Sequence, residues 1–185
     1  ACEYIVPNST VWSECWDDNF WLPRGKRISV TGNTFSKGYD TNIFISDSFY
    51  GNIAGNDLYK TSTGVWLSAD YGFTVTGNTF LCMSNDSMLI DRCQDITVVG
   101  NRLQDSSVGW NNTQTGIAIR LGSSKVVVVG NTIYEMATNK LKYGVGEITN
   151  GTDYNLIAHN IVRGAVTAGV YGFGPNTLID TNIVT

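Results

Sequence analysis

The chain of 185 residues carries a formal net charge of −4, with 42% hydrophobic and only 15% charged residues. This length is sufficient for one domain with a core, and the 20 glycines with abundant Asn, Thr, Ser and Val favour strands and turns over helices. There is no Lys/Arg cluster, which argues against a nucleic-acid partner. There is also no apolar run near the roughly 20 residues of a membrane span, which argues against membrane insertion.

The first segment, residues 1–27, lacks the repeat that fills the rest of the chain. It contains three tryptophans and two adjacent aspartates: Trp12, Trp16, Trp21, Asp17 and Asp18. An end of a repeat array exposes core and unpaired strand edges unless it is covered. We therefore expect residues 1–27 to form an N-terminal cap or an irregular first coil, in front of a repeat domain over residues 28–185.

Two short segments alternate along residues 28–185. The first ends in a Gly-Asn corner and has clear copies ISVTGNTF (28–35), FTVTGNTF (73–80), ITVVGNRL (96–103) and VVVVGNTI (126–133), with weaker copies at 51–58, 155–162 and 177–184. The second lies between the copies of the first: NIFIS (42–46), GVWLS (64–68), SMLID (87–91), GIAIR (116–120), GVGEI (144–148) and GVYGF (169–173). Each repeat of about 22 to 30 residues thus predicts at least two strands separated by polar and glycine turns.

Such short strands cannot bury one face alone, so we expect the coils to stack with every strand in parallel register. The prediction is an all-β fold, a right-handed, single-stranded parallel β-helix of about seven coils. Its core would receive the alternate residues of both segments: Ile28, Val30, Phe73, Val75, Ile96, Val98, Val126 and Val128 from the first, and Ile43, Ile45, Val65, Leu67, Met88, Ile90, Ile117 and Ile119 from the second. The repeated corner Asn residues, which tolerate positive φ, are expected to stack as a structural ladder.

These corners after a short alternating strand, together with the second strand and the coil length, resemble the parallel β-helix of the pectin-lyase-like superfamily. The resemblance covers residues 28–184. It implies the fold, and a superfamily of polysaccharide lyases, polygalacturonase-type hydrolases, inulin fructotransferases, uronan epimerases and phage tailspikes. It does not indicate which member this chain resembles, because the NTD, DD, GHG and RIK motifs of polygalacturonases and the Asp cluster with R-x-P-x-x-R of pectate lyases are absent.

The outward residues of the second segment form two predicted columns. The first reads Phe44, Trp66, Leu89, Ala118, Gly146 and Tyr171, and the second reads Ser46, Ser68, Asp91, Arg120, Ile148 and Phe173. Exposed aromatic rings suit stacking against sugars, and they suit a subunit interface equally well. Asp91 and Arg120 would form either a surface ion pair of little energetic weight or part of a groove in which Arg120 holds a uronate.

Two successive coils have long connections, residues 104–115 and 134–143, which predict a wall beside the second strand. They would bring further polar and aromatic residues near Arg120: Asp105, Trp110, Glu135, Lys140, Lys142 and Tyr143. Strict alternation points Glu147 inward, so either a bulge turns it outward or its carboxyl is partly buried, and burial would raise its pKa as a general acid requires. Asp91, Glu147, Asp105 and Glu135 are the carboxylates from which a hydrolytic pair could come.

The four cysteines, Cys2, Cys15, Cys82 and Cys93, match no zinc spacing. They are either free thiols or two disulfides formed within the close pairs, which would indicate an oxidising compartment. His159 is the only histidine and occupies the Gly position of a corner, so we expect it to be structural. The sequence indicates no cofactor and no metal site.

Two hypotheses for function follow. The first is an extracellular carbohydrate-active protein, secreted or on a virion surface, that binds or processes a polysaccharide or oligosaccharide by lyase, hydrolase or transferase chemistry. Its catalytic candidates are Asp91, Glu147 and Arg120, and its substrate-binding candidates are Phe44, Trp66, Trp110, Tyr171 and Lys142. Under it, the tryptophans and aspartates of residues 1–27 could belong to a glycan surface. The second is a structural or adhesive β-helix without catalysis. Under either hypothesis we expect a homo-oligomer, a trimer. Because the sequence stops within a repeat, we expect the chain to be a piece of a longer one or its end to be covered by another chain.

Overall fold

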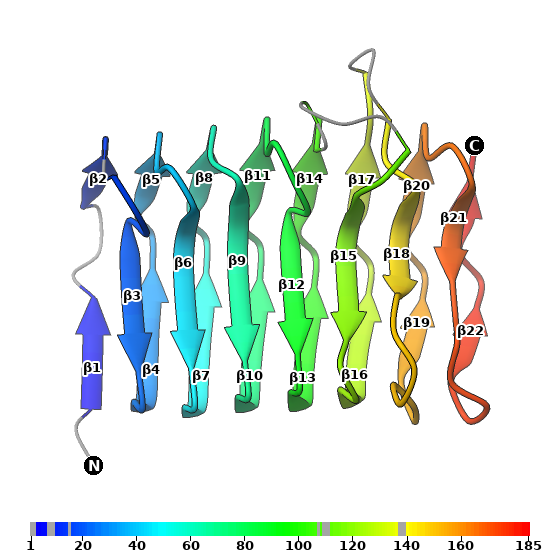
Figure 1. The fold of residues 1–185 in the computed structure, drawn as a ribbon, viewed down its shortest axis with the longest axis horizontal. Helices are drawn as coiled ribbons and strands as arrows, with labels where there is room; N and C mark the ends of the chain where they lie inside the picture. Colours follow the sequence, from blue (N-terminus) through cyan, green and yellow to red (C-terminus); the bar gives the residue numbers. More distant parts are fainter. Residues whose placement is uncertain (1–2, 7–9, 15, 107, 109–111, 137–139) are drawn as a thin grey trace.

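The computed structural model describes residues 3–6, 10–14, 16–106, 108, 112–136 and 140–185. These residues contain 23 strands and no helix, and the strands pair in parallel in three sheets (Figure 1). Consecutive strands belong to different sheets, and each pairs with the strand three places further along, so the chain winds as a right-handed parallel β-helix. The predicted fold is confirmed. No helix in the described part of the chain is long and apolar enough to cross a membrane.

The three sheets run the length of the molecule. Sheet A contains β1 (Glu3–Val6), β4 (Lys26–Thr31), β7 (Phe49–Ala54), β10 (Tyr71–Thr76), β13 (Gln94–Val99), β16 (Ser124–Val129), β19 (Leu156–Ala158) and β22 (Leu178–Asp180). Sheet B contains β2 (Val11–Ser13), β5 (Thr34–Ser36), β8 (Asp57–Tyr59), β11 (Thr79–Leu81), β14 (Arg102–Gln104), β17 (Thr132–Tyr134), β20 (Ile161–Arg163) and β23 (Ile183–Val184). Sheet C contains β3 (Phe20–Pro23), β6 (Thr41–Ser46), β9 (Thr63–Ser68), β12 (Met88–Asp91), β15 (Thr115–Arg120), β18 (Tyr143–Glu147) and β21 (Ala168–Tyr171).

Each complete coil therefore has three strands, one more than the minimum that the repeat predicts. The first repeated segment divides at its Gly-Asn corner: β4 ends at Thr31 and β5 begins at Thr34. Gly32 at this corner has φ +66°, in the left-handed region that favours glycine. At the equivalent Gly55 a Cβ would meet nothing within 4 Å, so the backbone conformation rather than a lack of space favours glycine there. His159 takes the same corner position at φ 54° and shares a 2.8 Å hydrogen bond between its Nδ1 and Thr181 Oγ1.

The core is the continuous stack of inward residues that the alternation predicts. All sixteen predicted inward side chains are at most 2% exposed. Their register is equally regular, since Ile53 pairs with Val30 on one side and with Val75 on the other. A fully buried side chain of this kind contributes about 1.5–3 kcal/mol, so the stacked columns are the main source of stability.

The predicted asparagine ladder runs along the turn between sheets A and B. At each step an asparagine Oδ1 accepts the backbone N–H and the side-chain amide of the asparagine one coil earlier. Asn78, for example, donates from both groups to Asn101 Oδ1, at 2.9 and 3.0 Å. The amide then donates to a carbonyl inside the helix, as Asn78 Nδ2 does to Ile53 at 2.9 Å. The ladder satisfies backbone donors at a corner where strand pairing is interrupted.

The N-terminal segment carries strands of all three sheets. β1, β2 and β3 pair in parallel with β4, β5 and β6, with a register irregularity between Glu3 and Tyr4. The Trp12 ring stacks on Phe35, with centroids 6.1 Å apart, and meets Phe20 edge-on at 6.2 Å. Trp12 therefore belongs to the packing of the helix rather than to its outer surface.

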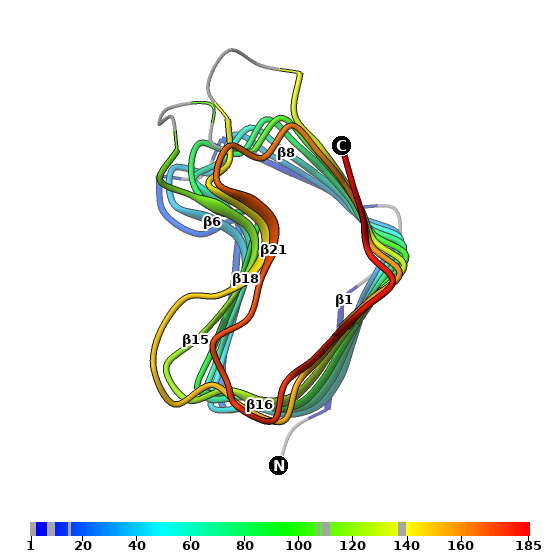
Figure 2. The same ribbon diagram turned by 90° about the vertical axis from the view of Figure 1, so that its right-hand side faces the viewer.

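Loops project on both sides of sheet C, as Figure 2 shows. On one side lie the described residues of the two predicted insertions, 112–114 before β15 and 140–142 before β18. They contact each other, because the Asn112 N–H donates to the Lys140 carbonyl at 2.8 Å. On the other side the connection of residues 148–155, between β18 and β19, projects from the coil (Figure 2). The outer face of sheet C thus lies between two sets of loops, in the position that the sequence predicts for a binding face.

Candidate functional site

An aromatic ladder begins the outer face of sheet C. Phe44 pairs in register with Trp21 and with Trp66. The Phe44 ring stacks on Trp66 with centroids 4.7 Å apart and on Trp21 at 6.5 Å, with interplanar angles of 24° and 13°. Trp21 is 60% exposed. The rings form one continuous apolar strip over the first three coils.

The predicted column contained Phe44 and Trp66, and its register is as expected through Leu89, Ala118, Gly146 and Tyr171. It omitted Trp21, which the sequence analysis placed in a segment outside the repeat. A signal for it exists, because Phe-Trp-Leu at 20–22 has the same in-out-in pattern as Ile-Phe-Ile at 43–45.

A charged cluster follows the aromatic ladder in the next two coils. Arg120 binds Asp91 through two hydrogen bonds, from Nε to Oδ1 and from Nη2 to Oδ2, both 2.8 Å. The Trp66 indole N–H donates to Asp91 Oδ2 at 3.0 Å. Asp91 is only 2% exposed, so this is a buried, bidentate ion pair rather than a loose surface contact. Hydrogen bonding to Asp91 raises the pKa of Arg120 above its usual value.

A second carboxylate, Asp86, joins this cluster and was not among the predicted site residues. It accepts the Thr115 N–H at 2.5 Å and is 9% exposed. Burial raises its pKa to about 6, with the Asp91 charge raising it further and the Arg120 charge opposing the rise. Asp86 precedes β12 in a turn, where no periodicity marks a residue, so only the fold shows that it lies near Asp91 and Arg120.

Glu147 points inward, as the alternation predicts, and is fully buried. Its carboxylate accepts four hydrogen bonds from the following turns: Asn155 Nδ2 at 2.6 Å, Thr177 Oγ1 at 2.6 Å, Phe173 N at 2.5 Å and Gly174 N at 2.8 Å. The expectation of a raised pKa is wrong. Burial raises the pKa of Glu147, but the four hydrogen bonds stabilise the charged form and lower it overall. Asp91 and Glu147 also lie on opposite faces of sheet C, so the structure does not bring them together as a pair.

A second group of aromatic rings lies beyond the charged cluster, in the sixth and seventh coils. Tyr143 stacks on Tyr171 with centroids 4.7 Å apart and an interplanar angle of 15°, and Phe173 follows Tyr171 at 6.4 Å. Lys142 Nζ lies 5.1 Å from the centroid of the Tyr143 ring, a cation–π contact. The structure thus brings together the predicted residues Lys142 and Tyr171, whereas Trp110 lies outside the described residues.

The two described cysteines are free thiols, so the disulfide alternative for Cys82 and Cys93 is wrong. Cys93 is buried, donates to the Asp91 carbonyl and accepts the Asp70 N–H, and burial raises its pKa to about 12. Cys82 lines a cavity of about 790 Å³ beside the turns that join sheets B and C. Cys2 and Cys15 are outside the described residues.

A family model described as "Periplasmic copper-binding protein (NosD)" matches residues 6–181, nearly the whole chain. The chain belongs to this family. No curated protein sequence matches the chain at a significant level.

The described residues of this NosD-family chain do not fit copper. Copper in proteins prefers imidazole, thiolate and thioether ligands. His159 is bound to Thr181 at a corner, the Cys93 thiol is hydrogen-bonded in the core, and Met83 and Met88 are fully buried among apolar side chains. Within the described ranges the one group of potential ligands from His, Cys, Asp and Glu contains only carboxylates. The third methionine, Met136, is 66% exposed, and no group of potential ligands that includes a thiol or an imidazole occurs in the described part of the chain, so these residues do not assemble a set of soft copper ligands.

Solved structures show the same fold in carbohydrate-acting proteins. The A-module of the Azotobacter vinelandii mannuronan C-5 epimerase AlgE6 superposes with a TM-score of 0.78 at 17% identity, covering 98% of this chain and 58% of that one. The AlgE4 A-module of the same organism gives 0.67 at 15% identity, covering 95% and 58%. The DFA-IIIase of Arthrobacter chlorophenolicus A6 gives 0.53 at 12% identity, covering 91% and 51%. The chain thus spans about 58% of the length of each epimerase module.

Proposed function

We propose that this protein binds a polysaccharide along the outer face of sheet C and acts on it outside the cytoplasm. The observation that carries the proposal is the aromatic ladder of Trp21, Phe44 and Trp66, which is continuous over three coils and partly exposed. Sugar rings present apolar C–H faces, and aromatic side chains offer matching flat surfaces. The family description, which names a periplasmic protein, and the epimerase and DFA-IIIase folds support this proposal.

The arrangement of the face supports a chain-like ligand rather than a single sugar. The two aromatic groups flank the charged cluster along the helix axis, and neighbouring strands lie about 4.8 Å apart. A polymer lying along this axis would stack on Trp21 and Phe44 at one end and on Tyr171 and Phe173 at the other. Asp86, Asp91 and Arg120 would lie beneath its middle. Lys142, beside Tyr143, would favour an acidic polymer.

We further propose that any reaction uses Asp86, Asp91 and Arg120 rather than Glu147. Asp86, with a pKa of about 6, can exchange a proton near neutral pH, and Arg120 can neutralise a uronate carboxylate. Asp86 and Asp91 are both nearly buried, and Trp66 and Arg120 are hydrogen-bonded to Asp91, so these two side chains would have to move for a sugar to reach Asp91. Glu147 holds the following turns in place by its four hydrogen bonds.

A glycan-binding titration tests the first part of the proposal. Mannuronan, other uronans, inulin-type fructans and capsular polysaccharides would be titrated against the wild type, Trp21→Ala and Trp16→Ala. Trp16 is the matched control, because it is 93% exposed in the same coil but is not part of the aromatic ladder. Loss of one stacked ring, worth about 0.5–1.5 kcal/mol, should weaken binding about 2- to 12-fold in Trp21→Ala alone. Equal effects in both variants, or no binding to any glycan, would count against the proposal.

Product analysis tests the second part. Unsaturated uronate absorbance reports lyase activity, new reducing ends report hydrolysis, and NMR of the intact polymer reports a change of configuration. Asp86→Asn should abolish the activity that is found while Glu147→Asp, which retains the carboxylate, should keep part of it. Activity unaffected by Asp86→Asn and Asp91→Asn would place the reaction elsewhere.

A non-catalytic, structural role is the second candidate, and the burial of Asp86 and Asp91 favours it. In that case the aromatic ladder would be the contact between subunits of a trimer. Light scattering separates the two candidates, because Trp21→Ala should then convert an oligomer into a monomer. A wild-type monomer would exclude this role for the aromatic ladder.

A further inference from the structure

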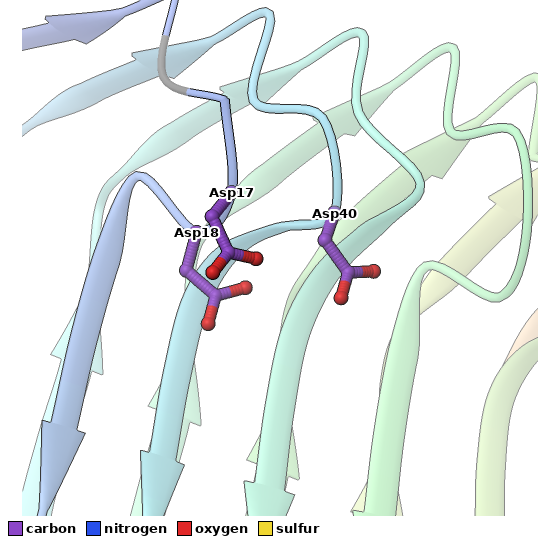
Figure 3. Close-up of side chains that lie close together, drawn as sticks. All are labelled: Asp17, Asp18 and Asp40. Carbon is purple, nitrogen blue, oxygen red and sulfur yellow. The ribbon is translucent and has the colours of Figure 1, made fainter.

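Three aspartates from the turns of two neighbouring coils lie close together (Figure 3). Asp17 and Asp18 lie in the turn before β3, and Asp40 lies in the equivalent turn before β6. One carboxylate oxygen of each residue lies within 4.8 Å of those of the other two. The Thr41 N–H donates to Asp18 Oδ1 at 3.1 Å, so the two coils are already joined at this point.

No ion pair to any of these three aspartates is seen among the residues that the structure describes. Neither of the ion pairs seen among the described side chains, Lys37 with Glu14 and Arg120 with Asp91, involves this group. Burial raises the pKa of Asp18, and the charges of Asp17 and Asp40 raise it further, against the opposing effect of Thr41. Crowded carboxylates without a cation are unfavourable when they are all ionised.

A buried hydroxyl faces the same group and provides an independent indication of a ligand. Thr41 is fully buried, and its Oγ1 has no hydrogen-bond partner of good geometry within the described ranges. Its side chain nevertheless lies close enough to the Asp18 carboxylate to lower the pKa of Asp18. A buried hydroxyl without a partner is costly, and its lone pairs would be satisfied by a bound cation.

We propose that Asp17, Asp18, Asp40 and Thr41 form a binding site for a calcium ion that joins the first coil to the second. Calcium takes carboxylate, hydroxyl and water oxygens at 2.3–2.6 Å. Three oxygens within 4.8 Å of one another can all reach that distance from one ion. The donor set consists only of hard oxygen atoms, which disfavours copper, the metal in the family description.

The site has a consequence for the aromatic ladder, although it does not depend on the proposed function. Trp21 lies three residues after Asp18, and Phe44 lies four residues after Asp40. A cation that holds these two turns together would hold β3 against β6 and keep the Trp21 ring stacked on Phe44. Removal of the cation should therefore loosen the first coil and leave the remaining coils in place, because coils of a solenoid contact only their neighbours.

The test uses the full chain after treatment with a chelator. Calcium binding would be measured by calorimetry, by Tb³⁺ luminescence excited through tryptophan, and by thermal unfolding with and without calcium. The variants are Asp40→Asn and the double variant Asp17→Asn/Asp18→Asn, with Asp57→Asn, an exposed aspartate of β8, as the control. Calcium should raise the Tm of the wild type and of Asp57→Asn by about 3–5 °C. Asp40→Asn should bind at least 10-fold more weakly and lose most of the shift.

A variant that fails to fold is distinguishable from one that loses the ion. With chelator present, Asp40→Asn should be at least as stable as the wild type, because it removes one of three repelling charges. A wild type that shows neither a Tm shift nor Tb³⁺ emission up to about 10 mM calcium would overturn the proposal. An equal calcium response in Asp40→Asn would also overturn it.

Discussion

Asn101, in the middle of the asparagine ladder, provides a direct test of what stabilises the stacked coils. Its Oδ1 accepts the backbone N–H of Asn78 at 2.9 Å and the Asn78 amide at 3.0 Å. Its Nδ2 donates to the Val75 carbonyl at 2.9 Å and to Asn131 Oδ1 at 3.0 Å. Asn101→Ala removes these four hydrogen bonds and a longer fifth one, from Nδ2 to the Val99 carbonyl at 3.4 Å, and it leaves the buried Asn78 N–H without a partner. An orphaned donor costs about 1–3 kcal/mol and each of the three other short bonds about 1 kcal/mol, so we expect a loss of about 4–6 kcal/mol.

The assay is reversible urea unfolding at pH 7, followed by far-UV circular dichroism. The matched control is Asn52→Ala, since Asn52 is exposed on the outer side of β7 and makes no hydrogen bond through its side chain among the described residues. The control should change the free energy of unfolding by no more than about 0.5 kcal/mol. If Asn101→Ala also costs less than about 1 kcal/mol, then water replaces the ladder at little cost and the reasoning fails.

Three further predictions concern buried charges and close packing. Burial raises the pKa of Asp70 to about 7 and of Glu135 to about 8; the folded state therefore holds protons that the unfolded state releases near pH 4, and stability should fall as pH rises from about 4 to 8. Urea unfolding across that range measures the free energy of unfolding as a function of pH. Glu135→Gln should make this dependence on pH weaker in the upper part of the range, and an unchanged dependence would contradict the prediction. The lowered pKa of Glu147 has the opposite effect on stability. Its contribution to the free energy of unfolding is present above about pH 4.3 and is lost as the pH falls through the folded-state pKa. Glu147→Gln should cost about 2–4 kcal/mol at pH 7, because an amide cannot accept all four hydrogen bonds; equal melting of variant and wild type would show that the bonds are dispensable. A Cβ at Gly51 would lie 2.1 Å from the Phe73 ring, so Gly51→Ala should lower thermal stability by at least about 1–3 kcal/mol, and a drop below about 0.5 kcal/mol would indicate that the ring moves freely.

The candidate site could be predicted only in the part that follows the repeat. Phe44, Trp66, Asp91 and Arg120 lie in one strand position per coil, so counting by repeats placed them in the correct columns. Asp86 and the Asp17, Asp18 and Asp40 group lie in turns, where the number of residues varies and alternation does not apply. Their proximity depends on the path of each turn, which the sequence pattern does not report.

By itself the sequence determined the stacking, because alternation of apolar residues and a recurring Gly-Asn corner allow only one way to bury so many short strands. The inward columns and the asparagine ladder follow from that periodicity. Only the tertiary structure decided the chemistry of individual side chains. The pKa of Glu147 is lowered rather than raised because its partners, Asn155, Phe173, Gly174 and Thr177, arrive from turns 8 to 30 residues later. Trp21 joins the aromatic ladder because β3 pairs in register with β6. Both depend on contacts between neighbouring coils, whose geometry exists only once the chain has folded.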